Sequence, residues 1–166
     1  MRKKIPSDTG CFRFHDANPK GKKTGDCVLR ALSVVFDRSW DDMLDDLVSY
    51  AHKYKQMAND PILYSKYVKD NGYVQVKQPV HADGTKVSGR DLCNAFSSMN
   101  DGVTHPVLLR LGTHHVSVIS YVKDEKGIYH YKVLDTWNCS EDKVGKMYMH
   151  ADDAEKWNHR ATQWVF

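Results

Sequence analysis

The hydrophobic period of this chain changes near its middle, and this change constrains the fold more than any other feature. Between residues 27 and 71, apolar side chains recur at helical spacing. Between residues 106 and 134, runs of β-branched and apolar residues alternate with turn signals, a pattern typical of strands. Helices followed by strands, with no alternation between them, predict an α+β fold whose sheet is antiparallel.

The first predicted helix begins at Cys27. Apolar residues follow it at helical spacing as far as Phe36, and Asp26 stands where an N-cap residue would accept hydrogen bonds from free backbone amides. Cys27 is therefore expected in the first turn of a largely buried helix. That position favours a reactive thiol, because the amides and the dipole of a helix N-terminus stabilise a thiolate.

The remaining elements are predicted from caps, breakers and alternation. A capping-box-like start at Ser39 opens a second helix, and Pro61 opens a third that ends at Asn71 and Gly72. Further helices are expected from Ser88 to Phe96 and over 152–157, and strands over 73–76, 106–111, 116–121, 128–134 and 163–166.

Length and composition indicate one domain spanning residues 1–166, with the polar residues 1–25 irregular and 1–17 forming a lead-in. The net charge of +3 is too small to favour a nucleic-acid partner. No stretch reaches the ~20 apolar residues that a membrane span needs. The basic start lacks a following apolar region, so no signal peptide is predicted and a cytoplasmic location is expected.

Four cysteines, Cys11, Cys27, Cys93 and Cys139, are widely scattered along the chain. None belongs to a CxxC pair, so neither a metal site nor a cofactor is predicted. Cysteine outside such patterns is most often a small buried residue. Cys27 differs from the other three because it is the one placed at the mouth of a helix.

An imidazole and a carboxylate flank the predicted hairpin. His115 opens one strand and Asp135 closes the next. In an antiparallel pair the start of one strand lies beside the end of the other. Counting from the turn pairs Tyr121 with Ile128 or Tyr129, and His115 with Leu134 or Asp135. The count brings a carboxylate within reach of an imidazole, the arrangement that orients a general base.

Three segments resemble the signature regions of papain-like cysteine peptidases. They are Gly25–Leu32, His115 before a strand, and Asp135-Thr-Trp137, which is similar to the Asn-Ser-Trp of papain. The first segment also resembles the Asp-Gly-Asn-Cys-Leu-Phe-Arg-Ala stretch of ovarian-tumour-type deubiquitinases. A group of uncharacterised phage and prophage proteins is similar over roughly residues 18–148, through Asn18-Pro-Lys20, Thr24–Val28, Ser39-Trp-Asp41 and Asp135–Cys139.

The resemblance implies a papain-like fold and a catalytic triad. It assigns Cys27 as the nucleophile, His115 as general base and then acid, and Asp135 as the group that orients the imidazole. His114 competes with His115, since both precede the same strand and are expected on opposite faces. His115 is favoured because the family places the imidazole immediately before the strand.

Two supporting roles follow from the same resemblance. The family's oxyanion-hole glutamine corresponds here to Gly21, so Asn18, the nearest side-chain amide, is assigned that role beside the backbone amide of Cys27. Trp137 is expected to shield the histidine's hydrogen bond. Asp26 departs from the family pattern, because its charge opposes a neighbouring thiolate unless it caps the helix.

The function expected from these residues is that of a cysteine-dependent hydrolase, a peptidase, isopeptidase or amidase that forms a covalent acyl-enzyme. A protein or peptide substrate in the cytosol of a phage-infected bacterium is implied. The alternative is a phage-encoded binding or inhibitor protein that keeps the scaffold without needing catalysis. A metal site formed by the same three residues is disfavoured, because local ligand pairs are missing.

Overall fold

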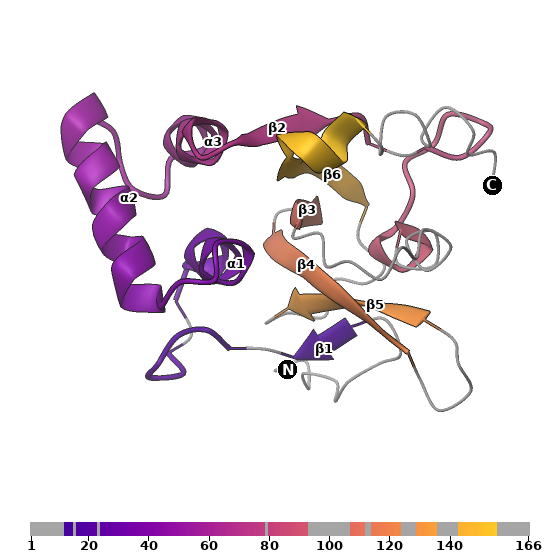
Figure 1. The fold of residues 1–166 in the computed structure, drawn as a ribbon, viewed down its shortest axis with the longest axis horizontal. Coiled ribbons are helices and arrows are strands. Elements are labelled where there is room, and N and C mark those ends of the chain that lie inside the picture. The colour runs from indigo at the N-terminus through magenta and orange to yellow at the C-terminus, as the bar shows by residue number, and fades with distance from the viewer. Residues whose placement is uncertain are drawn as a thin grey trace.

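The protein is a mixed α+β chain in which helices precede most of the sheet (Figure 1). The computed structural model describes residues 12–14, 16–22, 24–78, 80–92, 107–111, 114–123, 129–135 and 143–155. The elements are β1 (Phe12–Phe14), α1 (Cys27–Val35), α2 (Trp40–Tyr54), α3 (Pro61–Asp70), β2 (Tyr73–Val76), β3 (Val107–Leu111), β4 (His114–Lys123), β5 (Tyr129–Asp135) and β6 (Val144–His150).

One six-stranded sheet joins all the strands in the order β1-β5-β4-β3-β6-β2. Its pairs are antiparallel except β1 with β5, which are parallel. Strand β1 corrects the prediction that residues 1–25 are irregular. Three residues carry no strand signal of their own, and β1 exists through its pairing with β5, from Phe12 opposite Val133 to Phe14 opposite Asp135.

Strand β6 was not predicted, because its sequence does not alternate cleanly. Met147, Tyr148 and Met149 are consecutive and all buried, so both faces of this strand are covered. A strand covered on both faces loses the period-2 signal that sequence reading depends on. Its neighbours β3 and β2 satisfy its backbone groups on both sides.

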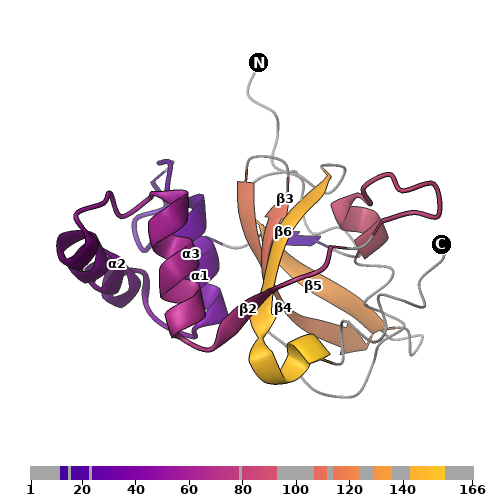
Figure 2. The same ribbon diagram turned by 90° about the horizontal axis from the view of Figure 1, so that it is seen from above.

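The three helices gather on one side of the sheet (Figure 2). They share a core with the sheet in which Leu32 of α1, Met43 of α2, Val68 of α3 and Leu108 of β3 are fully buried. Burying side chains of this size stabilises a fold by about 1.5–3 kcal/mol each. This shared core fixes α1, and with it Cys27, against the sheet.

Local capping explains where α2 and α3 begin, as the sequence predicts. The Ser39 hydroxyl accepts a hydrogen bond from the Asp42 amide at 3.0 Å. The Asp60 carboxylate accepts one from the Ile62 amide at 2.7 Å, directly before Pro61. Gly72 follows α3 with a φ of +86°, a left-handed conformation that glycine adopts without steric cost.

The other face of the sheet is covered in part by residues 80–92. Val87 and Leu92 of this segment are fully buried, as is Val107 of β3, and the Val144 amide donates to the Val87 carbonyl at 2.9 Å. Ser88 begins a helical turn over residues 89–92, and a second helical turn spans 151–155. The rest of the helix expected as far as Phe96, and the strand expected over 163–166, lie outside the described residues.

Candidate functional site

Cys27 is the first residue of α1, and its thiol is partly exposed. Helix α1 packs against β4 and β3. The C-terminal end of α1 lies by β2, where the Tyr73 hydroxyl donates to the Val35 carbonyl at 3.4 Å. Tyr73 belongs to the end of the sheet where β3 begins, so the N-terminal end with Cys27 is directed towards the other end, where β3 finishes at Leu111 and β4 begins at His114.

His115 is the second residue of β4 and pairs with Arg110 of β3. Leu108, two residues before Arg110, belongs to the core beneath the helices. Because strand residues alternate between faces, Arg110 and its partner His115 both belong to the helix-covered face of the sheet. The fold therefore places His115 at the same end and on the same face as Cys27.

Asp135 is the last residue of β5, at this same end of the sheet (Figure 1). The predicted register needs correction, because Tyr121 pairs with Tyr131 rather than with Ile128 or Tyr129. Strand β4 runs two residues further than expected, to Lys123, so each β4 residue near the turn pairs with a later residue of β5 than predicted. A β-bulge between Val118 and Ser120 reduces this displacement by one residue on the side towards His115.

In the observed register Asp135 is not directly opposite His115 but is displaced from it by one residue along the strand pair. Ser117 pairs with Leu134, so continuing the ladder brings Asp135 opposite Val116. Alternation then assigns Leu134 to the face of His115, and Asp135 to the opposite face together with His114. The orientation of His115 by Asp135 stays a prediction. The two candidate histidines differ in the face of the sheet to which they belong, His115 on the helix-covered face and His114 on the opposite one.

Asp26 does not cap α1, contrary to the sequence prediction. Its carboxylate instead accepts hydrogen bonds from Arg30 Nε at 2.7 Å, Asn18 Nδ2 at 3.0 Å and Trp40 Nε1 at 3.0 Å. Burial acts to raise the pKa of Asp26, but these bonds, led by that from Arg30, hold it below its ordinary value. The charge beside Cys27 is therefore balanced by a guanidinium and not by helix amides.

Asn18 is buried and joins the lead-in to α1. Its Nδ2 donates to Asp26, its Oδ1 accepts from the Lys20 amide at 3.0 Å, and its own amide donates to Asp16 at 3.0 Å. This set of bonds gives Asn18 a role in shaping the loop before Cys27. Its assignment as an oxyanion-hole donor stays a prediction.

Arg30 is the residue beside the candidate site that sequence reasoning missed. Besides Asp26, its guanidinium contacts the Asp16 carboxylate and the Lys22 carbonyl, and it is buried. Three contacts from one guanidinium hold the lead-in loop against α1. The four-residue spacing of Asp26 and Arg30 is a signal that could have found this pair, because such residues share a helix face.

Cys27 of α1 and Arg110 of β3 both act electrostatically on the Tyr64 phenol of α3. Burial raises the pKa of the Tyr64 phenol, the Arg110 charge opposes that rise, and Cys27 adds to it. The stem of Arg110 packs over Gly145 of β6, where an added Cβ would meet the Arg110 Cβ and Cδ at 3.6 Å. A thiol and a guanidinium thus lie within electrostatic range of one phenol.

Trp137 and the cysteines at positions 11, 93 and 139 are outside the described residues. Within the described part of the chain, no group of three or more His, Cys, Asp or Glu side chains could hold a metal ion.

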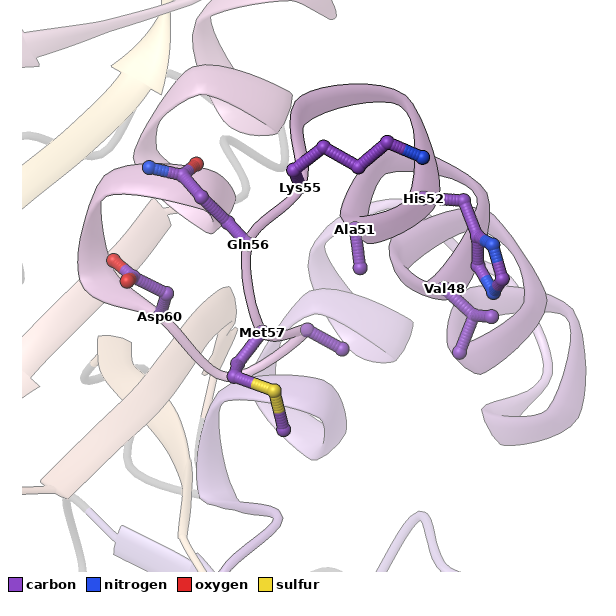
Figure 3. Close-up of a pocket in the computed structure, with 8 residues that line it drawn as sticks. Val48, Ala51, His52, Lys55, Gln56, Met57 and Asp60 are labelled. Carbon is purple, nitrogen blue, oxygen red and sulfur yellow. The ribbon is translucent and has the colours of Figure 1, made fainter.

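An open hollow of about 760 Å³ lies at the C-terminal end of α2 (Figure 3). It is formed by the last turns of α2 and the connection to α3, and its lining residues are Val48, Ala51, His52, Lys55, Gln56, Met57, Ala58 and Asp60. None of the predicted site residues lines it. The hollow therefore contributes nothing to the chemistry of the thiol.

No family model, curated protein or solved structure matches this chain. None of the helices in the described ranges combines the length and the apolar character that crossing a bilayer requires.

Proposed function

We propose that the chain is a cysteine-dependent hydrolase of papain-like type, acting as a peptidase, isopeptidase or amidase. The observation that carries the proposal is the position of Cys27, at the N-terminus of a helix packed on β4. His115 occupies the same end and the same face of the sheet. A thiol and an imidazole held by two packed elements are the minimum that thiol hydrolysis needs.

The first chemical step would be attack of the Cys27 thiolate on a carbonyl carbon. A carbon–sulfur bond forms, the carbonyl oxygen takes up the negative charge, and the free amides at the start of α1 stabilise it. The Asp26 side chain does not accept a hydrogen bond from these amides, so capping by Asp26 does not compete with the carbonyl oxygen for them. The carbon–nitrogen bond then breaks, and the amine leaves with the proton that the imidazole had taken from the Cys27 thiol.

The second step would hydrolyse the resulting thioester. The imidazole of His115 takes a proton from water, the hydroxide attacks the acyl carbon, and the thiolate leaves. Asp135 ends the neighbouring strand at the same end of the sheet and is proposed as the residue that orients the imidazole. Because its strand position belongs to the face opposite His115, this role would require its carboxylate to reach His115 around the end of the strand. If the imidazole belongs to His114 instead, Asp135 shares its face, which keeps this alternative open.

The lead-in network supports the proposal through its charge balance. A carboxylate directly before the nucleophile disfavours a thiolate. Arg30 offsets this effect, because its guanidinium is bound to both Asp26 and Asp16. The resemblance to papain-like peptidases supports a protein or peptide substrate, and the resemblance to phage proteins supports the cytosol of a bacterial host as the place of action.

Alkylation tests the proposal without knowledge of the substrate. The wild-type protein, treated with iodoacetamide at near-neutral pH, should label rapidly at one cysteine identified by peptide mass spectrometry. Cys27→Ala should abolish the rapid phase, and the matched control Cys93→Ala should keep it. Equally slow labelling of all the cysteines would contradict the hydrolase assignment.

A second candidate function is a binding protein that uses the same scaffold without catalysis. The observation in its favour is exposed apolar surface at and near the α2 hollow, where Met57 is 73% exposed and Ile62 67% exposed. This candidate predicts that Cys27→Ala keeps the full effect of the protein when it is expressed in a bacterial host. The hydrolase proposal predicts that the same variant loses that effect.

A further inference from the structure

We propose, on the basis of the proposed function, that Arg110 makes the Cys27 site selective for substrates that carry a carboxylate close to the bond attacked. The site would then accept acyl groups with an acidic side chain or terminal carboxylate beside the reacting carbonyl. Arg110 would act as a specificity-determining residue, separate from the residues that perform proton transfer.

The position of Arg110 follows from the backbone. It pairs with His115 across β3 and β4 and belongs to the helix-covered face of the sheet. Helix α1 packs against both strands, with Cys27 at the end of the helix nearest to this pair. The Arg110 stem lies next to Gly145, because a Cβ added there would come into van der Waals contact with the Arg110 Cβ and Cδ. Arg110 thus belongs to a strand of the sheet rather than to a loop.

The electrostatics of one phenol agree with the placement that the backbone gives. Tyr64 is only 5% exposed, and both Arg110 and Cys27 act on its ionisation. Cys27 of α1 and Arg110 of β3 therefore both lie within electrostatic range of this buried ring. Charges in partly buried positions interact more strongly than charges in bulk water.

The chemistry of arginine identifies the ligand. Its guanidinium stays charged at every accessible pH, whatever other groups it contacts, and its planar fork fits a carboxylate through two parallel hydrogen bonds. The acidic groups of the lead-in, Asp16 and Asp26, are already bound by Arg30. A substrate carboxylate at this site would accordingly meet the charge of Arg110 rather than those two carboxylates.

Two alkylating reagents that differ in charge test the inference. Iodoacetate carries a carboxylate and iodoacetamide a neutral amide, while both react at the same methylene carbon with the loss of iodide. The measured quantity is the ratio of their rate constants at Cys27, iodoacetate over iodoacetamide. We expect this ratio to exceed that of N-acetylcysteine at the same pH, and added salt to lower it.

Substitution of Arg110 should remove the preference. Arg110→Gln should lower the ratio about fivefold, an effect of the size expected for one nearby charge. Arg110→Lys should retain most of it, because the positive charge remains. Lys86→Gln is the matched control, since it removes one positive charge from an exposed position on residues 80–92, which cover the other face of the sheet.

The outcomes separate this inference from the proposed function. Rapid labelling by iodoacetamide with a ratio unchanged by Arg110→Gln would overturn the role of Arg110 and leave the hydrolase intact. Slow labelling of wild-type Cys27 by both reagents would overturn the hydrolase itself. If Arg110→Gln does not fold, the ratio of rate constants measured on the wild-type protein decides the question. A wild-type ratio that equals that of N-acetylcysteine and does not change with salt overturns the inference.

Discussion

Arg30 Nε donates to Asp26 Oδ1 at 2.7 Å, so a buried ion pair lies one helical turn along α1, directly behind Cys27. The side chains of both partners are about nine-tenths buried. The same guanidinium contacts Asp16, which belongs to the lead-in. The start of α1 therefore depends on a charged contact as well as on apolar packing.

Removing Arg30 should cost more stability than removing a surface charge. Arg30→Ala leaves Asp26 buried without its main partner, and we expect a loss of about 3 kcal/mol in the free energy of unfolding. Urea denaturation with an unchanged m-value measures this loss. Arg38→Ala is a suitable control, because its pair with Asp46 is more exposed and its loss should cost less stability. Equal losses for the two variants would contradict a structural role for the buried pair.

Acid should weaken the same contact. The pKa of Asp26 is lower in the folded protein than its ordinary value, so its contribution is complete above about pH 4, the unfolded value. That contribution is lost as the pH falls through the lower folded value. Asp26→Asn should therefore be less stable than wild type at neutral pH, with the difference shrinking in acid. Urea midpoints measured across the acid range test this, and a constant difference would refute it.

Tyr67 should stay protonated well into alkaline solution. Burial and a 2.7 Å hydrogen bond from its hydroxyl to Asp46 Oδ2 raise its pKa to about 12. Because the folded value lies above the unfolded one of about 10, Tyr67 contributes stability that is complete below pH 10 and lost as the pH rises towards 12. Tyrosinate absorbance should show one fewer late-titrating group in Tyr67→Phe. An unchanged late phase in that variant would contradict the assignment.

The two neighbouring histidines can be separated by their faces. We expect His115→Ala to slow alkylation of Cys27 at least tenfold at near-neutral pH, in line with the loss of a general base. His114→Ala should leave the rate within about twofold, because position 114 belongs to the opposite face of β4. Circular dichroism spectra of both variants check that the fold is kept. The reverse pattern would transfer the role to His114, which shares its face with Asp135.

Several elements could be predicted from the sequence because their signals are local. Ser39 and Asp60 cap their helices through contacts with residues two or three positions away. The same holds for Gly72, whose conformation depends on its own backbone. The helical spacing that begins at Cys27 predicted α1 for the same reason.

The candidate site was predictable only in part. Strand order along the chain brought His115 and Asp135 to one end of the sheet, but the register between them depends on a bulge at Val118–Ser120 that no local pattern marks. The Asp26 cap was wrong, because a distant loop supplies Asn18 and Asp16 to the network. A side chain can bind any group that the fold brings near it, whereas a local sequence pattern identifies only partners a few residues away in the chain.

The amino-acid sequence by itself determined the α+β division and the start of each helix, since periodicity and caps act within a few residues. Only the tertiary structure decided that β1 joins β5, that Arg30 neutralises Asp26, and that Arg110 lies opposite His115. These contacts join residues far apart in the chain or depend on strand register. Their energies come from pairing and burial, which exist after the chain has folded.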